Sequence, residues 1–371
     1  MANMKRQNKN SQLGFTLMEL MVAAAVGLIA MAAMASLFKS GMAATIMVEQ
    51  RAEMQQNMRA GIDLMVKDIS LAGAGLPVGI QLPVGGTASK FGCDQTNTCY
   101  VTNNTYPSGN FMYGIIPGYL TGVEGGAIIP AAPAAVNDSI TVVYTDYNFP
   151  LNEYNLTFVA GTNGGEVNAT WNANYTTAPP AINSSGGIQV GDLIIINGGG
   201  VTEVGEVTNV ASAGTANGSS GTITFANGDP LNINQSGATS NNLKAVATAA
   251  GAGNCTGYRL YAVTYYLMVP GGLQTPRLMR QVNGLTPVPV ADDIINMQLT
   301  YDTYNSSVSP AVLDANQVNP IGAGESPNNI QKVNLWLMGQ SLNNWGNKAQ
   351  NIGLATSVSA NNLTFRSQQQ Y

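Results

Sequence analysis

The sequence contains no histidine, and this absence excludes several kinds of enzyme and metal site. Catalytic triads with histidine, zinc sites with histidine ligands and acid–base catalysis by imidazole all need that side chain. The sequence also has no nucleophile elbow, phosphate-binding loop or paired-acid motif that would nominate a catalytic residue. A glycosidase-like pair of carboxylates stays open, because such a pair needs no motif in the sequence. We expect a protein that is not an enzyme and has no cofactor.

Charged residues are also scarce: they make up 9% of the 371 residues, against about a quarter in average globular proteins. The formal net charge is −5, and the first fourteen residues hold three of the fifteen basic residues and none of the twenty acidic ones. The rest of the chain is therefore acidic, and we predict no nucleic-acid binding. The hydrophobic content of 45% and the fifteen tyrosines indicate a packed core rather than a disordered chain.

Cysteines are few as well, and only two of the three are close in sequence. Cys93 and Cys99 enclose a turn-forming loop that a disulfide can close in an oxidising compartment. Cys255 is then free, or it pairs with either of the others, and the sequence leaves this connectivity open. A metal site built on two cysteines without histidine is the alternative, and calcium bound by scattered loop carboxylates also stays open. We name no metal ligands.

The longest apolar stretch covers residues 15–38 and contains one charged side chain, Glu19. A helix of that length, at about 1.5 Å per residue, crosses the hydrocarbon core of a bilayer. The positively charged side chains before it place the N-terminus in the cytoplasm and the rest of the chain outside. These are Lys5, Arg6 and Lys9. We therefore predict a single-pass inner-membrane segment over 15–38.

The junction before this stretch has a basic leader that ends in Gly14, then Phe15, with Glu19 as the fifth residue from Phe15. It resembles the class III signal peptide of type IV pilins and of the pseudopilins of type II secretion. The resemblance implies that a prepilin peptidase cuts between Gly14 and Phe15 and methylates the new amine of Phe15. A buried Glu19 can then pair with that amine on a neighbouring subunit and set the register of assembly. The alternative is an ordinary signal anchor with Glu19 near the membrane interface.

The helix is expected to continue beyond the apolar stretch, because apolar residues recur at helical spacing with charged residues between them. This stripe consists of Ile46, Met54, Met58, Ile62, Met65 and Ile69. The first stop is the small-residue run at 72–75, so we predict one helix over 15–71, about 85 Å long. Its first half lies in a membrane or filament, and its second half packs against a globular head.

Beyond residue 73 the sequence predicts strands and turns. The expected strands are 139–144, 191–197, 203–210, 258–269, 277–282, 294–301 and 333–339, with a last one near 363–367. Long loops are expected over 73–133, 160–187 and 211–242. The predicted fold is α+β: a long N-terminal helix packed on a β-rich extracytoplasmic head. The expected division is a cleaved leader at 1–14, the helix at 15–72 and the head at 73–371.

The end of the helix and the last third of the chain resemble the PilW-type minor pilins. Residues 67–73 are similar to the Asp-x-Arg-x-Ala-Gly signature of that family, with Asp68 in place and Ser70 where arginine is usual. Other positions fit the strands of that family: Arg280, Asp293, Tyr301, Leu335, Leu337 and Arg366. Ser36 stands where many major pilins have a proline that interrupts the helix.

These resemblances imply a minor pilin that joins a type IV pilus at or near its tip and helps to start assembly. The implied partners are the prepilin peptidase, other major and minor pilins, the inner-membrane assembly platform and a tip adhesin. The chain would move from the inner membrane to the filament at the cell surface. Two alternatives remain: a J-type pseudopilin of type II secretion, and an adhesin or ligand-binding head displayed on a pilin stem.

Overall fold

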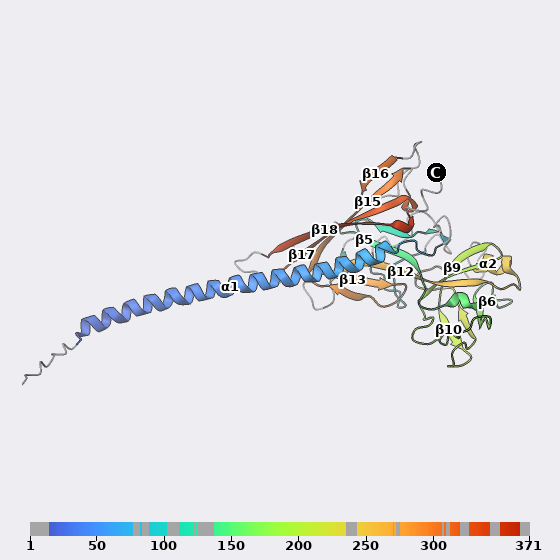
Figure 1. Cartoon of the computed structure of the whole chain (residues 1–371), viewed down its shortest axis with the longest axis horizontal. Coiled ribbons are helices and arrows are strands. Elements are labelled where there is room, and N and C mark those ends of the chain that lie inside the picture. The colour runs from blue at the N-terminus through green and yellow to red at the C-terminus, as the bar shows by residue number, and fades with distance from the viewer. Residues whose placement is uncertain are drawn as a thin grey trace, which may run out of the picture.

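The computed structural model places one long helix beside a head of several sheets (Figure 1). The described residues are 15–76, 82–83, 89–101, 111–121, 123–124, 137–234, 243–269, 271, 275–305, 308, 312–319, 326–341 and 349–363. The basic residues of the leader, Gly14 and Arg366 lie outside the described residues. Within them, the long helix and the mainly antiparallel sheets confirm the expected α+β fold.

The helix α1 (Leu17–Ser70) is continuous for 54 residues, close to the predicted 15–71. Its first half extends away from the head, as the blue helix in Figure 1 shows. Its second half packs the predicted apolar stripe against the sheets, and Met58 and Met65 are fully buried there. The helix stops at the run of small residues, where Gly73 has a φ of 75°, a left-handed conformation that glycine adopts without strain.

In the described part of the chain, the central sheet has eight strands organised around the longest one, β12 (Thr256–Met268). Its other strands are β3 (Ile115–Gly118), β4 (Val123–Glu124), β5 (Ser139–Asp146), β8 (Leu193–Gly198), β9 (Val201–Glu206), β13 (Arg277–Val282) and β14 (Val288–Ala291). Strand β12 pairs antiparallel with β5, β8 and β13, and parallel with β4. Apolar and aromatic residues dominate β5 and β12 because these strands lie in the middle of the core.

The terminal sheet is antiparallel and contains the last strands among the described residues, drawn in orange and red in Figure 1. Its order is β16 (Val312–Gln317), β15 (Ile294–Asn305), β17 (Ile330–Gln340) and β18 (Asn351–Ser359). One face of β17 is buried, with Val333, Leu335 and Leu337 in the core beside α1. The main core is therefore shared by the second half of α1, the central sheet and the inner face of the terminal sheet.

A smaller sheet has a core of its own. Its order is β10 (Asn209–Ser212), β11 (Gly221–Thr224), β7 (Glu166–Trp171) and β6 (Tyr154–Phe158). The short helix α2 (Leu243–Ala250) packs nearby against β8 and β9. Three shorter pieces complete the described elements: the pair β1 (Leu82–Pro83) and β2 (Phe111–Met112), and the 3-10 turns η2 (Leu151–Glu153) and η3 (Pro327–Asn329).

Most of the expected strands are present, and the errors fall in regions rich in small and polar residues. The three expected loops are wrong in part: 73–133 contains β1 to β4, 160–187 contains β7, and 211–242 contains β11. The expected strand 203–210 is divided between β9, which pairs with β8, and β10, which belongs to the smaller sheet. Helix α2 and strands β6, β14, β16 and β18 were not predicted. The expected last strand near 363–367 is wrong at Leu363, which is helical, and 364–367 lie outside the described residues.

Candidate functional site

The N-terminal end of α1 holds the residues that the signal motif singles out. Thr16 is the N-cap, and its hydroxyl accepts a hydrogen bond from the backbone N–H of Glu19 at 3.3 Å. The Glu19 carboxylate accepts in return from the backbone N–H and the hydroxyl of Thr16, both at 3.0 Å. This reciprocal capping box forms because threonine and glutamate are three residues apart at the helix start. Glu19 thus caps its own helix in the isolated chain, one turn from the exposed Phe15.

The first half of α1 has no cover from the rest of the described chain. Phe15 is 87% exposed, and the apolar window long enough to cross a membrane has none of its residues buried. Side chains of this kind are stable only when lipid or another protein removes them from water. The single apolar helix therefore fits a single-pass membrane anchor.

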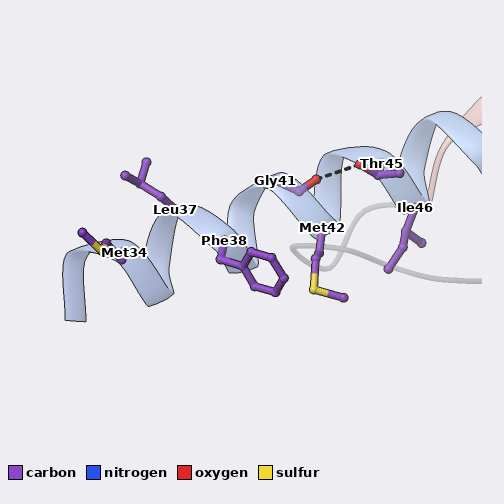
Figure 2. A pocket seen from close by; sticks show the side chains of 7 residues that line it. All are labelled: Met34, Leu37, Phe38, Gly41, Met42, Thr45 and Ile46. Carbon is purple, nitrogen blue, oxygen red and sulfur yellow. Dashed lines mark hydrogen bonds between the residues drawn. The ribbon is translucent and has the colours of Figure 1, made fainter. Parts of the chain in front are cut away.

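A hollow of about 690 Å³ lies where the exposed half of α1 approaches the head (Figure 2). Phe38, Met42 and Ile46 point from the same side of the helix into it, as Figure 2 shows. The Thr45 hydroxyl donates to the carbonyl of Gly41 at 3.1 Å, so this polar side chain is satisfied within the helix. The surface left at this point is apolar and suits a neighbouring helix or lipid.

The helix remains regular at Ser36, the position at which many major pilins have proline. The Ser36 carbonyl accepts a hydrogen bond from the hydroxyl of Ser40 at 3.0 Å, and α1 continues without interruption on both sides. Serine allows this because it retains the backbone N–H that proline lacks. The isolated helix thus has no proline-induced break at this point.

The other end of α1 is joined to the head by a buried carboxylate, Asp68, which is 3% exposed. It accepts hydrogen bonds from the hydroxyls of Tyr144 at 3.0 Å and Tyr265 at 2.6 Å. It also forms an ion pair with Arg280, whose Nε lies 2.9 Å from Asp68 Oδ2. We call these four residues the Asp68 cluster. It ties the helix to β5, β12 and β13 at once.

Burial and the Asp68 charge both affect the partners in this cluster. Burial, followed by the nearby carboxylate, raises the pKa of the Tyr144 and Tyr265 hydroxyls, so both stay protonated as donors. Burial alone would lower the pKa of Arg280, but the hydrogen bond and charge of Asp68 raise it more. Asp68 and Arg280 each matched a family position in the sequence. The sequence did not indicate that the two residues, 212 positions apart, form an ion pair.

The other positions that matched the family pattern lie in the main core or at a turn. Tyr301, Leu335 and Leu337 are buried in the main core. Asp293 lies at the turn before β15 with a φ of 60°, and its carboxylate accepts from the Thr275 hydroxyl at 2.8 Å. These residues shape the head, and none of them lies at the exposed end of α1.

Cys93 and Cys99 are joined by a disulfide, and Cys255 is a free, buried thiol. Inside the disulfide loop, the Asp94 carboxylate accepts from the backbone N–H groups of Thr96 at 2.8 Å and Thr98 at 3.2 Å. These bonds fold the loop over its own carboxylate, as is usual for aspartate in tight turns. The loop therefore stands as a structural unit on the head.

Two buried carboxyl groups lie next to each other beneath this loop. Glu206 accepts from Gln95 Nε2 at 2.6 Å and from the backbone N–H of Leu231 at 3.1 Å. Asp229 accepts from the backbone N–H groups of Ile233 at 2.7 Å and Asn234 at 2.9 Å. Burial and the neighbouring Asp229 raise the pKa of Glu206 to about 9, so this pair holds a proton at neutral pH.

These carboxyl groups do not form an open catalytic or metal centre. Glu206 is fully buried and Asp229 is 5% exposed, so a glycan substrate has no access to the pair. Asp146 and Asp192 are engaged by Arg259, and Asp138 accepts from two backbone N–H groups. In the described part of the chain, no three Asp, Glu, Cys or His side chains gather as metal ligands.

Comparison with known families identifies one segment. The family described as "Prokaryotic N-terminal methylation motif" matches residues 9–35, which end within the first half of α1. Together with the exposed apolar helix, this match supports a type IV pilin-like protein. The motif also implies processing by a prepilin peptidase and assembly with pilin partners. Neither the curated proteins nor the solved structures give a significant match to the chain.

Proposed function

We propose that this pilin-like chain is a minor pilin of a type IV pilus, of the PilW type, located at or near the filament tip and active in starting assembly. The observation that carries the proposal is the exposed apolar half of α1, which directly follows the methylation motif. A helix of this kind can exchange membrane lipid for neighbouring helices with little change in the apolar surface exposed to water. The role is mechanical rather than catalytic.

Processing would prepare the end of the helix for this exchange. Cleavage between Gly14 and Phe15 removes the basic leader and gives Phe15 a free amine, which the peptidase methylates. Glu19 caps its own helix in the isolated chain, and in the filament its carboxylate pairs with the Phe15 amine of a neighbouring subunit. A carboxylate in an apolar helix bundle is costly without such a partner, so correct register is favoured over sliding.

The Asp68 cluster suits this role because extraction from the membrane applies force to α1 and the head must follow. Met58, Met65 and Ile69 are buried between the helix and the sheets, and the ion pair with Arg280 fixes the last turn. The helix and head would therefore move as one body. The size of the head, at 73–371, favours a subunit present in few copies, since bulky heads crowd a thin filament.

The proposed partners follow from this path. The prepilin peptidase acts first, the inner-membrane assembly platform then extracts the subunit, and other major and minor pilins surround α1 in the filament. A tip adhesin would join the same complex. The chain would begin in the inner membrane with a cytoplasmic N-terminus and end at the cell surface.

The test is a deletion of the gene in its native host, complemented with the wild type or with Glu19→Ala. We expect the deletion to reduce the number of pili, the wild type to restore it and Glu19→Ala to fail. Glu49→Ala is the matched control, because Glu49 is an exposed acid of α1 outside the apolar half, and it should restore piliation. Normal piliation with a loss of type II secretion in the deletion would contradict the proposal and indicate a pseudopilin.

A further inference from the structure

The outer face of the terminal sheet has a groove of about 470 Å³. Residues alternate across β17, so Leu335 and Leu337 face the core while Asn334 and Trp336 face outward. Gly339 belongs to the inner face, where an added Cβ would lie 2.9 Å from the Met58 sulfur of α1. The groove thus opens on the side of the sheet that faces away from α1.

Uncharged polar groups and one aromatic ring line this groove. The outward side chains are Gln298, Thr300, Asn316, Asn334, Trp336 and Ser357. Asn316 and Asn334 each carry an amide group with a donor nitrogen and an acceptor oxygen, and Ser357 carries a hydroxyl. They offer both donors and acceptors to a bound molecule. The volume is typical of small-molecule sites, which span roughly 300–1,000 Å³.

The amides are held in position before any ligand arrives. Asn316 has a φ of 57°, and its backbone N–H donates to Asp302 Oδ1 at 3.0 Å. Asn334 Nδ2 donates to the same carboxylate oxygen at 3.0 Å and lies 3.3 Å from Asn316 Oδ1. The other oxygen of Asp302 pairs with Lys332 at 3.4 Å. Fixed polar groups lose little entropy on binding, which favours a specific ligand.

The indole of Trp336 lies against the neighbouring strand because that strand has a glycine there. A Cβ added to Gly353 would lie 3.0 Å from Trp336 Nε1 and 3.5 Å from two ring carbons. Gly353 therefore leaves room for the ring at the surface of β18. A half-buried tryptophan held in this way presents a rigid apolar surface beside polar groups.

We propose that this groove binds a neutral saccharide. The apolar C–H face of a pyranose ring packs on an indole, and its hydroxyl groups both donate and accept hydrogen bonds, as the amides and the serine require. The lining has no charged side chain, which matches an uncharged ligand and offers nothing to an acidic one. It has one aromatic ring and no outward-facing large aliphatic side chain, so it does not resemble the apolar centre of a protein interface. This inference does not depend on the pilin function.

The test is binding of cellotetraose, chitotetraose and lacto-N-tetraose to the full chain, measured by calorimetry in a detergent without a sugar headgroup. We expect at least one of these neutral probes to bind saturably and the acidic tetragalacturonate to bind more weakly. Trp336→Ala and Asn334→Ala should each weaken binding about tenfold or more, the effect of losing one good contact. Gln340→Ala is the matched control on the outer face of β17, outside the groove, and should change affinity less than twofold.

A second readout separates sugar binding from contact between subunits. In a Trp171→Phe, Trp345→Phe background, Trp336 is the remaining tryptophan, and its emission should shift when the bound probe is added. Failure of all three neutral probes would overturn the proposal. Unchanged affinity in Trp336→Ala, or a shift in emission with protein concentration alone, would also overturn it. Melting curves of the variants that match the wild type exclude unfolding as the cause.

Discussion

At the scale of single residues, the Asp68 carboxylate determines how α1 joins the head. Its three partners come from three strands and lie 76, 197 and 212 residues away in sequence. A buried carboxylate with this set of donors is satisfied, whereas the same group without them would be costly. The family-like signature at the helix end therefore has a structural explanation in this chain.

Removal of one member of the ion pair should cost more than removal of both. Asp68→Ala should lower the free energy of unfolding by about 2–4 kcal/mol, because the partly buried Arg280 and two buried tyrosine hydroxyls then lose their acceptor. The double variant combines Asp68→Asn with Arg280→Met. Its loss in free energy of unfolding should be smaller, by about 1–3 kcal/mol, than the sum of the losses in the two single variants. Urea unfolding of the full chain in detergent measures Asp68→Ala, Asp68→Asn, Arg280→Met and the double variant.

The control for this cycle is the exposed pair Arg277 and Asp292, whose side chains are 32% and 50% exposed. Asp292→Asn should change stability by less than about 1 kcal/mol, since exposed ion pairs contribute little. Additive effects of the Asp68 and Arg280 substitutions would contradict a coupled cluster.

Glu206 gives the head a stability that depends on pH. Its pKa is about 9 in the folded chain and near 4.5 when exposed, so between these values the folded state keeps a proton that the unfolded state has lost. The stability that this group provides is therefore complete below about pH 4.5 and is lost as the pH rises through 9. Glu203, with a pKa raised to about 7 by burial, should add to the same trend.

The prediction is that the urea midpoint of the wild type falls between pH 5 and pH 8.5, and that Glu206→Gln makes this fall smaller. Glutamine cannot ionise and keeps an amide donor beside Asp229, so the variant should gain relative stability as the pH rises. Glu166→Gln is the control, because Glu166 is a partly exposed acid at the start of β7. An identical pH dependence in the wild type and Glu206→Gln would refute a proton held in the buried pair.

At the scale of elements, the second half of α1 and the sheets form one core. Met58 is fully buried at the point where Gly339 of β17 lets the strand approach the helix closely. Met58→Ala should lower the free energy of unfolding by about 2–5 kcal/mol, the usual cost of a cavity in a packed core. Val48, which is 69% exposed on α1, supplies the control.

Val48→Ala should change stability by less than about 0.5 kcal/mol. The two variants are compared by thermal and urea unfolding of the full chain in detergent. If Met58→Ala were as mild as Val48→Ala, the head would not be packed on the helix in the way described here.

The elements that could be predicted were those with a strong apolar pattern. Helix α1 was predicted almost to its ends, and β5, β12 and β17 were recognised from runs of β-branched, apolar and aromatic residues. Strands β7 and β11 were not predicted, because they contain mainly asparagine, threonine, alanine and glycine, and such residues are also common in loops. Helix α2 was missed although alanine favours helices, because it is only eight residues long and lies between segments rich in glycine and polar residues.

The candidate site residues also differ in how far the sequence predicts them. The signal junction is local, so a short motif predicts cleavage between Gly14 and Phe15 and an assembly role for Glu19 from sequence alone, and these roles stay predictions. The capping role of Glu19 follows from Thr16 three residues earlier, although the sequence interpretation emphasised its assembly role. The Asp68 cluster and the groove at Trp336 could not be predicted, because each joins residues from strands whose register only the fold determines.

At the scale of the whole molecule, the chain combines a head with a complete core and a helix half with no cover of its own. The head buries a large set of apolar residues, and Arg259 and Arg280 pair with buried carboxylates there. The first half of α1 exposes large apolar side chains on every side and requires lipid or neighbouring subunits. This contrast is what a subunit extracted from a membrane into a filament needs.

Pilin-like processing and assembly are tested most directly by the mass of the N-terminal peptide in membrane and sheared-filament fractions of the native host. We expect a methylated N-terminus at Phe15 in filaments from the wild type, and loss of the chain from filaments in Gly14→Ala and Glu19→Ala. An uncut Met1 terminus that stays in the membrane fraction would contradict this expectation and would leave a single-pass protein whose function lies in its head.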